Sequence, residues 1–173
     1  MRAVFAYAAV MALLVGAAAA QQSAVKKYPL DGFEVAFTGP VKTTDVEVYP
    51  ENRREVLRGK QHDQAGSTVD GGQRLYTVAA NRNRSEIDFD RASTSAIAAL
   101  RCTTPVKDAP LTHPNGRARV YHGTGCKGEY DTIARYYVVG RRFFQVVAIY
   151  ATKGGDAAAA ERFLDSFKIT VRD

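Results

Sequence analysis

The chain has 173 residues, of which 24 are lysine or arginine and 18 are aspartate or glutamate, so its formal net charge is +6. This length suffices for one ordinary domain with its own hydrophobic core, without a structural metal or many disulfides. A moderately basic surface permits association with anionic lipid, a cell-wall polymer or an acidic partner, although ordinary solvated charge gives the same value.

Residues 1–20 predict a cleavable secretory signal. A short positive end at 1–2 precedes an apolar run over 3–15, and alanines at 18–20 are the small residues that a signal peptidase reads. The apolar run is shorter than the ~20 residues of a bilayer span, which favours a cleaved leader over a retained anchor. We expect one mature domain over 21–173, no further membrane span, and a periplasmic or secreted location.

The mature region begins with alternating and polar segments. Residues 21–27 are polar and expected to be frayed, whereas 33–37 alternate phenylalanine and valine with other residues, as a half-buried strand does. A second alternating run covers 43–49. The pattern is lost over 51–72, which we predict to be mainly loop, and another strand is expected over 74–80.

A helix is predicted over 89–100, where apolar residues fall at helical spacing after an aspartate-rich start. Residues 103–117 contain three prolines and an Asn-Gly turn, and are expected to form a connection. A strand over 118–124 follows. Cys102 and Cys126 flank these segments.

The two cysteines predict a disulfide, because an even count in an oxidising compartment favours pairing. The loop between Cys102 and Cys126 holds about 25 residues, and closing it is worth roughly 3 to 4 kcal/mol in the chain-entropy model. A redox or metal-binding pair is disfavoured, since there is no Cys-x-x-Cys and no histidine at ligand spacing.

The last third of the chain carries the clearest pattern. Strands over 130–139 and 142–151 form a predicted hairpin that is apolar on both faces, as in a central strand covered on both sides. A helix over 157–165 and a short strand over 167–171 complete the chain. This order predicts an α+β fold in which helices sandwich a central antiparallel sheet.

Two segments resemble a known group. Residues 32–40 read G-F-E-V-A-F-T-G-P, similar to a G-F-S-V-x-F-P-G opening, except that Thr38 replaces proline. The hairpin over 136–144 and the segment 160–167 are similar to the close of the same group. These features resemble the PsbP-like proteins, which implies an antiparallel sheet between helices. The group is functionally mixed and implies no shared active site.

No motif predicts a catalytic, metal or cofactor site. Residues 123–128 match G-x-G-x-x-G, but a dinucleotide site needs a following helix, so a glycine-rich turn around the disulfide is favoured. His62 and His113 fall in polar connections, where an exposed histidine is ordinary. His122 lies on a strand and is expected to be partly buried.

Basic residues gather in three stretches of the sequence. They are Arg53, Arg54, Arg58 and Lys60; Arg82 and Arg84; and Arg141 and Arg142. One hypothesis makes the first and third stretches contacts for an anionic partner, and the competing one makes all three solvated charge. Whether they share a face is open at this level.

The sequence favours an exported, non-enzymatic accessory or binding module whose ligand it does not identify. An envelope protein or an anionic surface is the expected class of partner, and nucleic acid is not. The alternative is a small hydrolase or metal-dependent enzyme that uses His122 or His62. A histidine hydrogen-bonded to a carboxylate in a pocket would favour the enzyme.

Overall fold

The computed structural model describes residues 24–48, 57–67 and 73–171, so the expected leader lies outside the described residues. No helix in this part of the chain is long and apolar enough to cross a membrane. The elements, in order, are β1 (Ala24–Tyr28), β2 (Phe33–Phe37), β3 (Lys42–Val48), β4 (Leu57–Ser67), β5 (Gln73–Arg82), α1 (Phe89–Leu100), β6 (Thr104–His113), β7 (Gly116–Cys126), β8 (Tyr130–Val139), β9 (Arg142–Ala151), α2 (Ala157–Asp165) and β10 (Lys168–Ile169).

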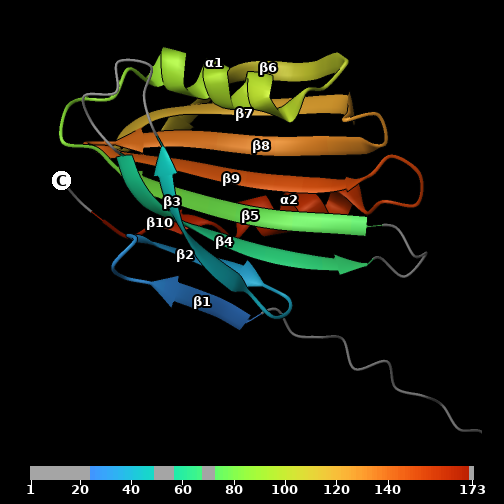
Figure 1. Ribbon diagram of the computed structural model, residues 1–173, viewed down its shortest axis with the longest axis horizontal. Coiled ribbons are helices and arrows are strands. Elements are labelled where there is room, and N and C mark those ends of the chain that lie inside the picture. Colours follow the sequence, from blue (N-terminus) through green and yellow to red (C-terminus); the bar gives the residue numbers. More distant parts are fainter. Residues whose placement is uncertain (1–23, 49–56, 68–72, 172–173) are drawn as a thin grey trace, which may run out of the picture.

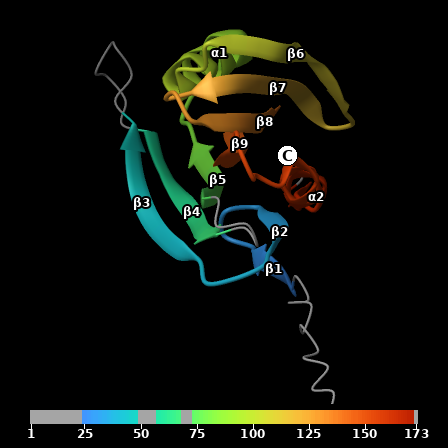
Figure 2. The same ribbon diagram turned by 90° about the vertical axis from the view of Figure 1, so that its right-hand side faces the viewer.

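The strands form two antiparallel sheets. The large sheet has the order β3-β4-β5-β9-β8-β7-β6, and the small one has the order β1-β2-β10. The large sheet curves around α2 and the small sheet, and α1 lies on its opposite face (Figures 1 and 2). The predicted α+β class, with a sheet sandwiched by helices, is therefore wrong. The fold is dominated by its two sheets. On the concave face of the large sheet, α2 lies beside a second sheet, because β2 pairs with β1 and β10 and not with the large sheet.

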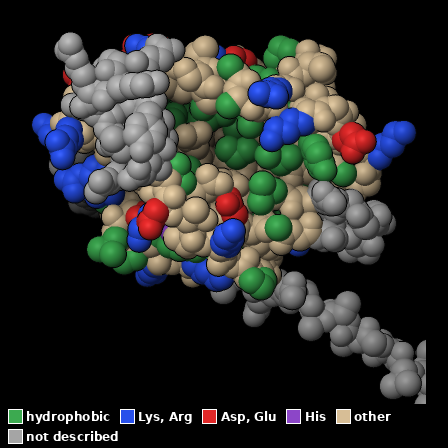
Figure 3. All heavy atoms as spheres, viewed as in Figure 1, with side chains coloured by type: hydrophobic (Ala, Val, Ile, Leu, Met, Phe, Trp, Pro, Cys, Tyr) green, Lys and Arg blue, Asp and Glu red, His purple; other side chains and the backbone are tan. Residues whose placement is uncertain are grey.

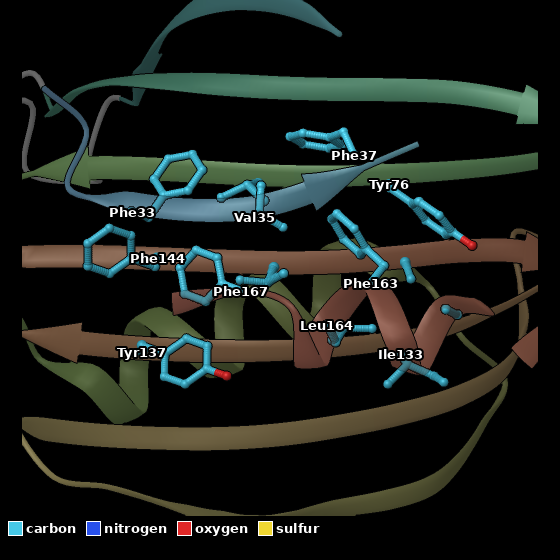
Figure 4. Packing of buried hydrophobic residues seen from close by; sticks show 14 of the residues in the cluster. Phe33, Val35, Phe37, Tyr76, Ile133, Tyr137, Phe144, Phe163, Leu164 and Phe167 are labelled. Carbon is cyan, nitrogen blue, oxygen red and sulfur yellow. The ribbon is translucent and has the colours of Figure 1, made fainter. Parts of the chain in front are cut away.

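The main core fills the space between the two sheets and α2. Phe163 of α2 stacks on Tyr76 of β5 with ring centroids 4.6 Å apart, and lies 5.4 Å from the ring of Phe37 in β2. Figure 4 shows these rings meeting with others, among them Tyr137 of β8 and Phe144 of β9, all of them buried. The predictions that the β8–β9 hairpin occupies the middle of the sheet and that α2 packs on it are confirmed.

A second cluster lies under α1, on the outer face of the large sheet. Phe89, at the start of α1, packs with Tyr121, Tyr136 and Phe143 from β7, β8 and β9. Asp88 caps this helix by accepting a hydrogen bond from the backbone N–H of Arg91. The helix bounds predicted from periodicity and capping agree with the structure for both α1 and α2.

Three strands were not predicted: β1, β4 and β6. In β4, the inward-facing side chains include His62 and Gln64, so the hydrophobic alternation that marks a strand is missing. Strand β6 contains Pro105 and Pro110, and it tolerates them because it is an edge strand that pairs only with β7.

The predicted disulfide is confirmed. Cys102, just after α1, bonds to Cys126 at the end of β7, with a Cα–Cα separation of 3.7 Å. The glycine-rich segment leads from one strand into the next, as expected, and Gly125 has φ of +63°. A side chain on Gly125 would collide with the hydroxyl of Thr103, so glycine is required where the chain closes on the helix end.

Candidate functional site: a cationic end of the large sheet

Described residues from all three basic stretches of sequence meet at one end of the large sheet. Arg58 in β4 is directly opposite Arg82 in β5, and Arg82 is directly opposite Arg142 in β9. The β8–β9 turn, with Arg141, is tied to the same place because the backbone N–H of Asn83 donates to the Arg141 carbonyl at 2.8 Å. Segments that are remote in the sequence are thus neighbours in space.

We call this region the cationic end. Its described side chains are Lys60, Arg82, Arg84, Arg141 and Arg142. The strand ends and turns that carry them lie on the left of Figure 1, and Figure 3 shows lysine and arginine side chains on that side. Arg53 and Arg54 fall outside the described residues, and the structure describes Arg58 by its backbone alone.

Two hollows lie on either side of Arg82. One has a volume of about 240 Å³, and the other, more open, about 490 Å³. The smaller is lined by residues that include Leu30, Asp31, Asp45, Lys60, Arg82 and Arg142. The larger is lined by Arg82, Asn83, Arg84 and Arg141. Across both hollows, cationic side chains outnumber carboxylates.

Within the described part of the chain, the charges at this end are not balanced by salt bridges. Among the described residues, no salt bridge involves Lys60, Arg82, Arg84 or Arg141. Three arginines elsewhere on the sheet are paired with carboxylates: Arg117 with Asp90, Arg119 with Asp108, and Arg135 with Glu161 and Asp165. Like charges directly opposite each other on neighbouring strands destabilise a sheet. Arg82 and Arg142 are such a pair, whereas Lys60 is directly opposite Asp45 of β3. The repulsion between Arg82 and Arg142 is therefore an electrostatic cost that a bound anion would offset.

Arg142 is held in position without neutralisation. Its Nη1 donates to the carbonyl oxygens of Asp31 at 3.1 Å and Leu30 at 3.4 Å, both in the turn between β1 and β2. These bonds leave the guanidinium charge uncompensated and join the small sheet to the cationic end. A guanidinium fixed in this way is suited to bind a phosphate or carboxylate group.

The carboxylate of Asp31 is already engaged by a histidine. Its Oδ2 lies 3.1 Å from Nε2 of His62, and Nδ1 of His62 lies 2.9 Å from the hydroxyl of Thr43. The expectation of an exposed His62 is wrong: the side chain is 2 % exposed and packs against the ring of Tyr28. Burial lowers the pKa of His62, and the hydrogen bond to Asp31 opposes that shift.

The other histidines form no comparable group. His122 is half-buried on β7 as expected, and its Nε2 lies 3.5 Å from the hydroxyl of Tyr150. His113 accepts a hydrogen bond from the backbone N–H of Asn115. Within the described ranges, no three or more His, Cys, Asp or Glu side chains are placed to hold a metal ion.

Sequence reasoning identified most of the basic residues of this site but not their companions. Leu30, Asp31 and Thr43 were missed, since their relevance comes from contacts between segments that are remote in sequence. Comparisons with protein-family models, curated proteins and solved structures find no match for the chain. The resemblance to the PsbP-like group stays a prediction.

Proposed function

We propose that the chain is an exported, non-enzymatic binding module that holds an anionic partner at its cationic end. The observation that carries this proposal is that residues from three remote basic stretches converge at one end of the large sheet, with no salt bridge among described residues at any of the five cations. Arg82 and Arg142 repel each other across neighbouring strands, and a bound phosphate or carboxylate would relieve that repulsion.

Two observations support export. The first twenty residues have the pattern of a secretory leader, and the Cys102–Cys126 disulfide is typical of proteins that mature in an oxidising compartment. Outside the cytoplasm, anionic lipid, acidic cell-wall polymers and acidic proteins are the available partners. All of them present phosphate or carboxylate groups.

The test uses the mature protein and long-chain polyphosphate, a soluble polyanion without an apolar phase. The variant Arg84→Ser/Arg141→Ser removes two exposed arginines from the cationic end. Its matched control, Lys107→Ser/Lys153→Ser, removes two exposed lysines from β6 and from the turn after β9, with the same change in net charge. Dissociation constants are measured at several salt concentrations.

The cationic-end variant should bind polyphosphate at least about tenfold more weakly, because it loses two charge-assisted contacts. Its affinity should also depend less steeply on salt, since fewer counterions are released. The control should stay within about twofold of the parent protein. Equal losses in the two variants would mean that binding follows net charge and would overturn the proposal.

A hydrolase that uses His62 is the second candidate. The observation in its favour is the chain of contacts from Thr43 through His62 to Asp31, which has the order hydroxyl, imidazole, carboxylate. In such an enzyme, Nδ1 of His62 would take the proton of the Thr43 hydroxyl while Asp31 held the opposite N–H. We rank it second because the rings of Tyr28 and Phe33 enclose His62 and neither hollow includes Thr43.

An experiment can distinguish a catalytic from a purely structural role of Thr43, His62 and Asp31. Thr43 is exposed on an edge strand, so Thr43→Val should leave the fold intact. Incubation with p-nitrophenyl acetate, butyrate and phosphate should give the same background rates for the parent protein and the variant. A rate that falls at least about a hundredfold in Thr43→Val would favour the hydrolase over the binding module.

A further inference from the structure

An exposed leucine lies on the rim of the smaller hollow. The side chain of Leu30 is 85 % exposed, more than the other two large apolar side chains recorded as exposed in the described part, Val25 at 55 % and Val106 at 58 %. Single exposed apolar residues are common on protein surfaces. Leu30 differs from the others in its setting, because it borders a hollow in which three cations, Lys60, Arg82 and Arg142, outnumber the two carboxylates of Asp31 and Asp45.

The turn that carries Leu30 is firmly held. The backbone N–H groups of Asp31 and Gly32 donate to the Tyr28 carbonyl at 3.1 and 2.8 Å, and the N–H of Thr170 donates to the Gly32 carbonyl at 2.9 Å. Arg142 binds the turn from the other side through the Leu30 and Asp31 carbonyls. Leu30 is thus fixed facing outward, beside a guanidinium group.

A fixed apolar side chain next to unpaired cations matches the chemistry of one kind of surface. At an anionic bilayer, lysine and arginine interact with lipid phosphates, while an adjacent apolar side chain enters the boundary between headgroups and acyl chains. A soluble polyanion would satisfy the cations and leave Leu30 in water. An acidic protein surface would need a cavity to receive Leu30.

We infer that the anionic partner is the surface of a bilayer that contains anionic phospholipid. The cationic end faces the bilayer, a lipid phosphate occupies the hollow beside Arg142, and Leu30 inserts between the headgroups. This inference rests on the proposed function, because it names the partner of the same site. It adds an apolar contact that binding to a soluble polyanion does not require.

The chain contains no tryptophan, so a single introduced indole reports on its own surroundings. Leu30→Trp places the probe on the rim of the hollow, and Val106→Trp places a matched probe on β6, away from the cationic end. Each mature variant is mixed with vesicles of phosphatidylglycerol and phosphatidylcholine in equal parts, with phosphatidylcholine vesicles, or with polyphosphate. Leu30→Ser is compared with Val106→Ser for vesicle affinity.

The emission of Leu30→Trp should shift to shorter wavelength only with the phosphatidylglycerol vesicles, and spin-labelled lipid should quench it. Val106→Trp should show neither effect. Leu30→Ser should weaken binding to these vesicles about tenfold and leave polyphosphate binding unchanged, since only the bilayer receives the leucine. Val106→Ser should behave as the parent protein does.

The outcomes separate this inference from the proposed function. Polyphosphate binding that depends on Arg84 and Arg141, without any emission shift at Leu30→Trp on bound vesicles, would leave an anion-binding module and overturn the bilayer inference. Equal affinity of Leu30→Ser and the parent protein for the vesicles would overturn it as well. Failure to bind polyphosphate and phosphatidylglycerol vesicles alike would overturn both.

Discussion

Truncation of Phe163 tests how the two sheets and α2 are held together. The side chain of Phe163 is 3 % exposed and lies between Tyr76 of the large sheet and Phe37 of the small one. The Tyr76 ring is nearly parallel to it, at an interplanar angle of 10°. Phe163→Ala removes the ring that bridges all three elements.

The expected loss combines three effects. The removed ring no longer gains the free energy of leaving water, a cavity remains where the surroundings do not collapse, and two aromatic contacts disappear. Phenylalanine truncation in a core costs about 3 to 5 kcal/mol, and aromatic pairs contribute about 0.5 to 1.5 kcal/mol each within such totals. We expect the upper part of that range, because the rings on both sides belong to different sheets and a cavity here has rigid walls.

Urea denaturation of the oxidised mature protein, followed by circular dichroism, measures the free energy of unfolding. In a thermal scan of the same protein, the melting temperature should fall by about 10 °C, as expected for a protein of this size. Leu30→Ala is the control, since the exposed leucine should contribute less than about 0.5 kcal/mol. A loss well under 1 kcal/mol for Phe163→Ala would mean that α2 is not docked between the sheets in this way.

Three further predictions concern pH, the disulfide and the leader. Burial lowers the pKa of His62 from 6.5, so as the pH falls the unfolded chain binds a proton before the folded protein does. The free energy of unfolding should therefore fall as the pH drops from 6.5 towards the folded pKa. Urea titrations of the parent protein should show this loss, and His62→Gln should lessen it. Reduction of Cys102–Cys126 should destabilise the fold by about 3 kcal/mol in the same assay, and thiol titration of the oxidised protein should detect no free thiol. Mass spectrometry of the exported protein should find Gln21 as the first residue, whereas a retained Met1 would contradict cleavage after Ala20.

Segments with regular hydrophobic patterns were predicted well from the sequence. The hairpin of β8 and β9 has alternating and branched apolar residues on both faces, and its bounds agree with the structure. Both helices were located by their apolar stripes and their aspartate caps. In these segments, the apolar residues that predict the helix or strand are also the residues that the fold buries.

Strand β4 and the two-sheet architecture could not be predicted in the same way. The inward side chains of β4 form hydrogen bonds with residues that flank β2. Gln64, for example, donates to the Thr38 hydroxyl at 2.8 Å and accepts from the Thr38 N–H at 2.9 Å. Such polar links satisfy buried groups without an apolar pattern, so a search for hydrophobic alternation overlooks them. The assignment of β2 to a second sheet depends on pairing with β1 and β10, which periodicity does not reveal.

The candidate site illustrates the same limit. The basic stretches were visible in the sequence, but their meeting depends on the register that sets Arg58, Arg82 and Arg142 side by side. The register follows from long-range pairing of β4, β5 and β9. Because β4 was not predicted as a strand, the first basic stretch could not be placed relative to the other two.

The most direct test of the account locates the bound anion by NMR. Polyphosphate is titrated into the isotopically labelled mature protein, and the backbone amide shifts are followed. We predict that the largest shifts cluster at residues 30–32, 58–60, 82–85 and 140–142, which meet at the cationic end. Shifts centred on α1 and β6, or spread evenly over all exposed lysines and arginines, would contradict the claim that this end is the binding site.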